Sequence, residues 1–304
     1  MEVIVLAIVK DKLGIVNTGS DSITILEMND NFRCQNFFLC EGKPYLGPHQ
    51  IIQEENKNIF YTTNSYDNSI YKINIHKKTI EDILLVGCYP SHIDILDNYL
   101  LVTNSDSNSI SVIDRVNFEL IENIPVGEKP HDIKVDKKTK KVYVANSNNY
   151  TIDVLDIYTN SINAIKLPFK PLHMFLGKEK AYVLCPLNNG MINSKIIIID
   201  LQMGIIEHCI EINGVINDMV IIEQNSVIYT SNIDDGYMYK IDMDKDKPSE
   251  KYYIGGMPNN LLFNNKYIYI TNVQSDCLHV FDVTKREIIK TIKTGKEPSG
   301  LLVY

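Results

Sequence analysis

Short runs of alternating or β-branched apolar residues, separated by polar turn clusters, recur along the whole chain. In one stretch they cover residues 131–135, 141–145, 151–155 and 161–165. Alternation over so few residues is typical of half-buried strands, and no sustained apolar spacing of 3.6 residues indicates a long helix. The pattern therefore predicts an all-β fold and disfavours a (β/α)8 barrel of similar length.

The runs belong to a repeat of about forty residues that is centred on an asparagine. Its clearest copies are Leu101–Asn104, Tyr143–Asn146 and Tyr269–Asn272, each followed by an aspartate and then by a proline. The column that they define contains Asn17, Asn64, Asn104, Asn146, Cys185, Asn232 and Asn272. Seven copies predict a seven-bladed β-propeller with four antiparallel strands per blade, in which neighbouring blades supply the core. We expect residues 1–304 to form one such domain.

Two segments compete to complete the first blade. Residues 298–304 match the innermost-strand motif, and residues 2–9 also read as a strand at about the right distance before Asn17. We predict that the C-terminal segment is the innermost strand and that the N-terminal strand joins it, so that strands from both termini close the ring.

Composition narrows the class of partner. With 44 % hydrophobic and 22 % charged residues the chain is typical of a globular protein. A formal net charge of -8, without a block of Lys or Arg, argues against nucleic acid and anionic membranes. No apolar run approaches membrane-spanning length, and the first residues do not resemble a signal peptide. We expect a cytoplasmic monomer whose six cysteines are reduced.

Four of the seven histidines follow the repeat's prolines. His49 and His131 come one residue after the proline, whereas His92 and His173 come two residues after it. The loop entering a blade's first strand lies at one mouth of the central channel, so we expect the four imidazoles there. Because adjacent strand residues point to opposite sides, the two pairs need not share a direction. Turn capping, a ligand-binding or catalytic role, and a metal site all remain open.

The same mouth receives the asparagine column, where Cys185 breaks the pattern. An asparagine there can hydrogen-bond its own turn, but a thiol cannot do so well. Cys185 is therefore a candidate nucleophile, beside His49 and His131 as candidate bases. Insertions at residues 186–193 and 43–47 also reach this face, the second of them carrying Tyr45. The candidate ligand-binding residues are His92, His173, Asn64, Asn104, Asn146, Tyr45, Asn217 and Asn259.

The repeat elements Tyr-Val-x-Asn, Ile-x-Val-Ile-Asp and Val-Gly-x-x-Pro-x-x-Ile resemble the YVTN-type β-propeller repeat. The best matches are residues 101–114, 126–133 and 142–156, and the resemblance covers essentially the whole chain. It implies the propeller fold but no particular activity, because propellers host many unrelated functions.

A second resemblance concerns two motifs, Pro48-His49-Gln50-Ile51 and Pro130-His131-Asp132-Ile133. They look like those of streptogramin lyase-type propellers, a resemblance that implies a histidine base and a divalent cation held partly by an acid in the next asparagine-like column. Here those columns hold Asn64 and Asn146 instead of a glutamate, so the acid is missing.

Three functions follow as hypotheses. The first is a binding module whose His/Asn/Tyr-lined mouth takes a peptide, a protein or a small polar ligand. The alternative is a lyase or hydrolase that acts on a cyclic or peptidic natural product with a mouth histidine as general base. The third is a histidine-bound metal centre, similar to the copper propellers of nitrous oxide reductase type. We expect no cofactor and assign no metal ligand, with a divalent metal as the alternative.

Overall fold

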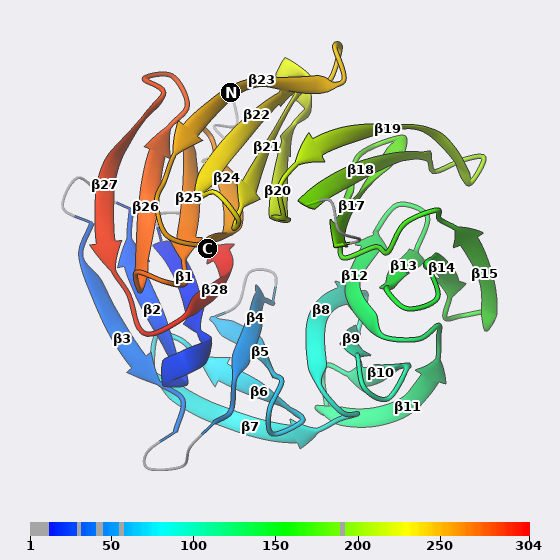
Figure 1. Cartoon of the computed structure of the whole chain (residues 1–304). Coiled ribbons are helices and arrows are strands. Elements are labelled where there is room, and N and C mark those ends of the chain that lie inside the picture. The colour runs from blue at the N-terminus through cyan, green and yellow to red at the C-terminus, as the bar shows by residue number, and fades with distance from the viewer. Residues whose placement is uncertain (1–11, 29–31, 41–44, 55–57, 189–191) are drawn as a thin grey trace, which may run out of the picture.

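The computed structural model describes residues 12–28, 32–40, 45–54, 58–188 and 192–304. In these residues seven four-stranded antiparallel sheets form a ring, which is a seven-bladed β-propeller (Figure 1). The all-β prediction is confirmed, since the helical elements of this part of the chain are two three-residue 3-10 turns, Thr18–Ser20 and Glu223–Asn225. No helix there has the length and apolar character that crossing a membrane requires.

Each blade contributes one strand to each of four concentric positions. The innermost strands are β28 (Pro298–Val303), β4 (Pro48–Gln53), β8 (Pro90–Leu96), β12 (Pro130–Asp136), β16 (His173–Leu176), β20 (Ile216–Ile222) and β24 (Pro258–Asn264). The second strands are β1 (Lys12–Asn17), β5 (Ile59–Asn64), β9 (Tyr99–Asn104), β13 (Lys141–Asn146), β17 (Lys180–Asn188), β21 (Val227–Asn232) and β25 (Tyr267–Asn272).

The two outer positions follow in the same order. The third strands are β2 (Ser22–Glu27), β6 (Ser69–Asn74), β10 (Ser109–Asp114), β14 (Thr151–Asp156), β18 (Ile192–Asp200), β22 (Tyr237–Asp242) and β26 (Cys277–Asp282). The outermost strands are β3 (Cys34–Phe38), β7 (Thr79–Leu85), β11 (Glu119–Pro125), β15 (Ser161–Lys166), β19 (Ile205–Asn213), β23 (Lys247–Tyr253) and β27 (Glu287–Lys293).

The ring closes where the end of the chain meets its beginning. β28 is the innermost strand of the first blade and pairs antiparallel with β1, with Leu13 opposite Val303. Figure 1 shows this red strand beside the blue ones. The predicted closure by the C-terminal segment is confirmed. The predicted strand at residues 2–9 lies outside the described residues, and its part in the closure stays a prediction.

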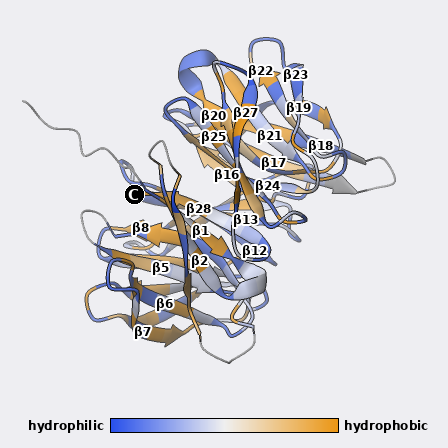
Figure 2. Ribbon diagram, turned by 90° about the vertical axis from the view of Figure 1, so that its left-hand side faces the viewer, coloured by the Kyte–Doolittle hydropathy of each residue, from blue (hydrophilic) through white to orange (hydrophobic). Residues whose placement is uncertain are grey.

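The hydrophobic core lies between blades. Each of seven clusters of buried side chains combines residues from two neighbouring sheets. In one of them Leu101 and Val112 of the third blade pack against Ile133 and Val144 of the fourth. Figure 2 shows apolar residues running along the strands. One sheet alone cannot bury both of its faces, so the stability of each blade depends on its neighbours.

In the third blade the Thr-Asn pair that ends the second strand makes two different contacts. The Thr103 hydroxyl donates to the carbonyl of His131 in the next blade (2.9 Å), whereas Asn104 Nδ2 donates to the Ser109 hydroxyl of its own blade (3.1 Å). Gly87, in the preceding loop, packs directly against the Asn104 amide. The contact is so close that a Cβ added to Gly87 would lie 2.6 Å from Asn104 Cγ. The threonine thus links one blade to the next, whereas the asparagine holds the turn of its own blade.

Candidate functional site at the mouth of the channel

A cavity of about 320 Å³ lies in the central channel, lined by the innermost strands. One repeat position faces it in every blade. This is the second residue after the repeat proline or, in the sixth blade, after Ile216, which takes the place of the proline. The position holds Gln50, His92, Asp132, His173, Asp218, Asn260 and Gly300. The cavity therefore has a polar girdle to which six of the seven sheets contribute a polar side chain and the first sheet contributes Gly300.

The rest of the wall is unevenly divided. Blades five to seven contribute mainly apolar side chains, among them Phe175, Met219, Leu261 and Phe263. The second to fourth blades contribute polar ones, which include Lys134. A ligand in the channel would therefore meet charged and imidazole groups on one side and an apolar surface on the other.

The four histidines predicted to share the mouth lie together. The ring centroids of His92 and His131 are 4.8 Å apart, and those of His131 and His173 are 5.0 Å apart. His49 lies 5.2 Å from His92 and 5.9 Å from His131. Four imidazoles from four different blades thus form one cluster of edge-to-face rings.

The histidines that follow the proline by one residue and those that follow it by two converge because strand pairing is irregular just after the proline. The register with the second strand shifts between Pro130 and Ile133 in β12, and between Pro48 and Gln50 in β4. Such an irregularity interrupts the alternation of side chains and turns the residue next to the proline. Residues one and two positions after the proline can therefore reach the same place.

Burial keeps the rings of His49, His92 and His131 neutral near neutral pH. Burial, followed by the nearby His173, lowers the pKa of His49 to about 4. Burial likewise holds the pKa values of His92 and His131 well below the ordinary value. Neutral imidazole carries one lone pair on a ring nitrogen, so the cluster offers lone-pair donors as well as N–H groups.

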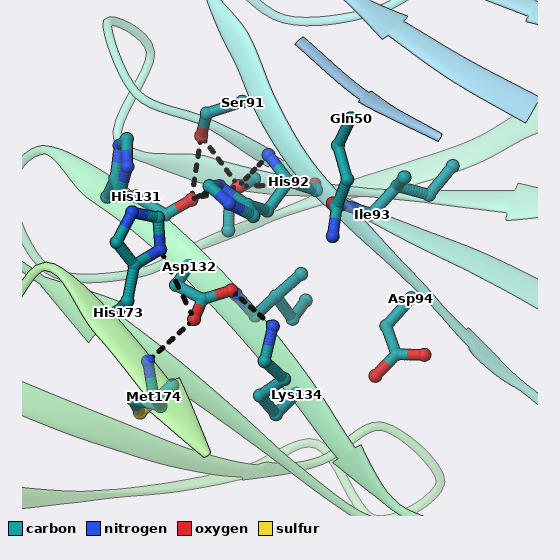
Figure 3. A network of polar contacts seen from close by, with 12 residues as sticks. Gln50, Ser91, His92, Ile93, Asp94, His131, Asp132, Lys134, His173 and Met174 are labelled. Carbon is teal, nitrogen blue, oxygen red and sulfur yellow. Dashed lines mark hydrogen bonds and ion pairs between the residues drawn. The ribbon is translucent and has the colours of Figure 1, made fainter. Parts of the chain in front are cut away.

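Asp132 organises the polar side of the cavity (Figure 3). Its Oδ1 accepts from the Lys134 ammonium at 2.9 Å, and its Oδ2 accepts from the Met174 N–H of the next blade at 2.7 Å. His173 Nδ1 lies 3.9 Å from Oδ2. Although burial raises the pKa of a carboxyl, Lys134 and the neighbouring histidines hold the pKa of Asp132 well below its usual range. The site thus contains a buried, ionised carboxylate.

Two more buried carboxyls face this region. Asp218 Oδ2 accepts from the Leu261 N–H, and Asp94 Oδ2 accepts from the Val135 N–H, each at 2.8 Å. Burial raises the pKa of both carboxyls, and the Lys134 ammonium opposes that rise. Like Asp132, each of these groups fastens one innermost strand to the next.

Cys185 lies away from the cavity. Its side chain is fully buried in the core between the fourth and fifth blades, and Sγ lies 3.9 Å from the carbonyl oxygens of Phe169 and Val183. Burial raises the pKa of this thiol. In the same copy of the repeat Pro168 stands where Gly87 and Gly127 stand in other copies. In this copy of the repeat, Pro168 therefore replaces the glycine of the Gly-Asn contact and Cys185 replaces the asparagine.

Three of the five candidate asparagines, Asn64, Asn104 and Asn146, are buried within their blades. Asn64 Nδ2 donates to the Ser69 hydroxyl at 3.0 Å, and Asn146 Nδ2 donates to the Thr151 hydroxyl at 3.1 Å. Asn104 makes the equivalent bond described above. Within the described residues, none of the three lines the cavity.

Within the described residues, the last three candidates, Asn217, Asn259 and Tyr45, do not line the cavity. The Asn217 amide donates to the Asn259 side-chain oxygen of the next blade, so these two residues continue the ring that His49 and His131 occupy. Tyr45 is 71 % exposed, and its backbone N–H donates to the Asp21 carboxylate at 2.9 Å. The predicted insertion at residues 186–193 lengthens the β17–β18 hairpin, of which residues 189–191 lie outside the described residues.

Sequence reasoning missed the carboxylates and the lysine. Asp132, Lys134 and Asp218 lie on innermost strands, two or four residues after the repeat proline or its counterpart. Aligning the seven copies at the second position after the proline would have found the polar girdle, since six of its seven residues are polar or charged. The four histidines stand out in the sequence because they follow the repeat's prolines. The polar girdle becomes visible only when the seven copies of the repeat are aligned.

Comparisons with known proteins support the fold. The chain resembles a protein of unknown function from Desulfotomaculum acetoxidans with a TM-score of 0.79 and 12 % identity, over 96 % of this chain and 98 % of the other. Hydrazine synthase from Kuenenia stuttgartiensis gives a TM-score of 0.76 and 18 % identity, over 85 % and 90 %. AztD from Citrobacter koseri, in its apo form, gives 0.63 and 13 %, over 95 % and 96 %.

These solved structures are seven-bladed β-propeller proteins of varied roles. No protein-family profile matches the chain, and no curated protein matches it either. At such low identities the likeness shows the architecture alone.

Proposed function

We propose that this protein is a binding module that takes a small polar ligand at the histidine end of its central channel. The observation that carries the proposal is a cluster of four imidazoles, of which His49, His92 and His173 line a cavity of about 320 Å³ and His131 packs against them. A cavity of this size suits a small molecule or ion. Its buried ionised carboxylate and its ammonium group supply the few oriented charges that fix a small ligand.

Two features support binding more strongly than general-base catalysis. A base is most effective when its pKa lies near the working pH, but the pKa of His49 is about 4. The candidate nucleophile, Cys185, is packed in the core between two blades, away from the cavity. The lyase or hydrolase alternative therefore lacks both an activated nucleophile and a well-matched base among the candidates.

Ring signals of the histidines give a direct test. Protein labelled with 13C at the histidine Cε1 atoms would be screened by NMR against amino acids, dicarboxylates, nucleosides and divalent transition-metal ions. We expect at least one class to shift signals of His49, His92, His131 and His173 and to leave those of His76, His208 and His279 unchanged. Shifts confined to the last three histidines, or no shift from any class, would contradict the proposal.

A further inference from the structure

The three histidines of the second to fourth blades have the geometry of a metal site before metal is bound. One ring nitrogen from each of His49, His92 and His131 lies within 4.8 Å of the other two. Zinc–nitrogen bonds of about 2.0–2.1 Å place tetrahedral donors about 3.3 Å apart. Rotation of the His49 and His131 side chains can close the remaining gap.

The tautomer of His92 is set by its hydrogen bond. Its Nδ1 lies 2.8 Å from the His131 carbonyl oxygen, which can only accept, so Nδ1 carries the proton. The lone pair is therefore on Nε2, and the outward hydrogen bond fixes the ring plane. Metal-binding histidines commonly use one nitrogen in this way while the other binds the metal.

His49 provides an independent observation. Its Nε2 is buried, and within the described residues no hydrogen-bond partner reaches it. A buried polar atom without a partner costs about 1–3 kcal/mol, and such an atom calls for an explanation. Coordination of a metal ion by this nitrogen would satisfy it.

The Asp132 carboxylate is better suited to a position beside the metal ligands than to binding the metal itself. A second group of donors, which consists of His92, Asp132 and His173, also lies within 4.8 Å. However, Asp132 already accepts from Lys134 through one oxygen and from the Met174 N–H through the other. The carboxylate is therefore better placed to orient His173 and to balance the charge of a nearby cation than to bind one directly.

From these observations we propose that His49, His92 and His131 bind one divalent transition-metal ion, of the Zn²⁺ or Cu²⁺ class that imidazole ligands suit. Three protein ligands leave the ion a position for water or for a second ligand. The inference deepens the proposed function by naming the class of ligand, and it rests on that function.

Calorimetric titration with ZnCl2 tests it. The full chain would be stripped with chelator, and its exposed thiols Cys34, Cys88 and Cys209 would be blocked with iodoacetamide to remove competing ligands. We expect one equivalent of Zn²⁺ to bind, and we expect His49→Gln or His92→Gln to weaken binding at least about 100-fold. His76→Gln, at an exposed turn, is the matched control and should bind like the unmodified sequence.

Folding and coordination are checked separately. Far-UV circular dichroism and thermal midpoints would show whether each variant is folded, and His49→Gln is the safer variant because its Nε2 has no hydrogen bond to lose. Co²⁺ in place of Zn²⁺ should give the visible absorption of a four-coordinate site, which a purely structural role of the histidines would not produce.

Two results would overturn the metal assignment. One is equal Zn²⁺ affinity in the unmodified protein and in folded His49→Gln, and the other is no uptake at about 100 μM free Zn²⁺. If either occurs while an organic compound still shifts the mouth histidine signals, the metal site is wrong and the binding function stands. If no compound and no metal reaches those histidines, both proposals fail.

Discussion

The Asp132 carboxylate and the Lys134 ammonium lie 2.9 Å apart on one innermost strand, and both line the channel cavity. The Asp132 side chain is 1 % exposed, whereas that of Lys134 is 31 % exposed. Removing Asp132 should therefore change the free energy of unfolding by a different amount from removing Lys134. Asp132 keeps its backbone N–H donors, whereas the Lys134 ammonium loses the carboxylate to which it donates and retains only the charge interactions with Asp94 and Asp218 within the described residues.

This asymmetry predicts unequal costs for two substitutions. Asp132→Asn should lower the free energy of unfolding by about 2–4 kcal/mol, because it removes the one carboxylate that forms an ion pair with the partly buried Lys134 ammonium in the described residues. Lys134→Met should cost about 1 kcal/mol, since the carboxylate retains two N–H donors. Urea unfolding with linear extrapolation measures both values. The reverse order would show that the carboxylate, not the ammonium, depends on the pair.

A second prediction concerns stability at acid pH in metal-free protein. The folded-state pKa of His49 is about 4, below the ordinary value of 6.5. As the pH falls, the unfolded chain takes up this proton before the folded one, so stability is lost between about pH 6.5 and pH 4. At pH 5 the loss from His49 alone is about 2 kcal/mol, and burial of His92 and His131 adds to it in the same direction.

The measurement is urea unfolding at pH 7.5 and pH 5.0 with a chelator present. His49→Gln should reduce the difference between the two pH values by about 1–2 kcal/mol. His76→Gln, at an exposed turn, should leave it as in the unmodified protein. Equal differences in all three proteins would mean that the His49 ring is solvated or already protonated in the folded state.

The ring and the histidine cluster could be predicted because both depend on the repeat. A forty-residue period with four short apolar runs has few compact solutions, and it places corresponding residues such as His92 and His173 at the same height around one axis. The burial of apolar residues between blades follows from the same reasoning. What remained open was whether His49 and His131, offset by one residue, would point the same way.

That question could not be answered from sequence because it depends on an irregularity in strand pairing. Nothing in Pro130-His131-Asp132 marks the register shift that turns His131 toward the other rings. The partner of Asp132 in the next blade, the Met174 N–H, lies 42 residues away and becomes a neighbour only when the fourth and fifth blades pack together. The chemistry of Asp132 therefore depends on the packing of neighbouring blades more than on its local motif.

A third prediction tests the contact between the loop glycine and the asparagine column. In Gly87→Ala the new methyl group would lie 2.6 Å from Asn104 Cγ, which is well inside contact distance. We expect the free energy of unfolding to fall by about 1–3 kcal/mol, the usual cost of overpacking. Gly14→Ala is the matched control, because its nearest neighbours would lie at 3.6 Å.

Thermal or urea unfolding of the two alanine variants distinguishes sterics from the general effect of replacing glycine. Gly14→Ala should be neutral or slightly stabilising, since alanine restricts the unfolded chain. Adding Asn104→Ala to Gly87→Ala should relieve part of the clash, so the double variant should lose less than the sum of the two single losses. Strict additivity would show that the glycine and the amide do not interact.

The last prediction concerns the reactivity of Cys185. A thiolate is the reactive form of cysteine, and burial raises the pKa of this thiol as well as blocking access to it. We expect iodoacetamide to modify Cys34, Cys88 and Cys209, which are exposed, in the folded protein. Cys185 should be modified only after unfolding in urea. Peptide mass mapping after timed labelling measures each site separately.

The same labelling experiment decides whether Cys185 can serve as a nucleophile. If it reacts in the folded protein as fast as Cys88, the core between the fourth and fifth blades must open readily, and the catalytic interpretation regains support. If it stays protected, its place in the asparagine column is explained by packing. The thiol then fills the space where Pro168 has replaced the glycine that an asparagine would contact in the other blades.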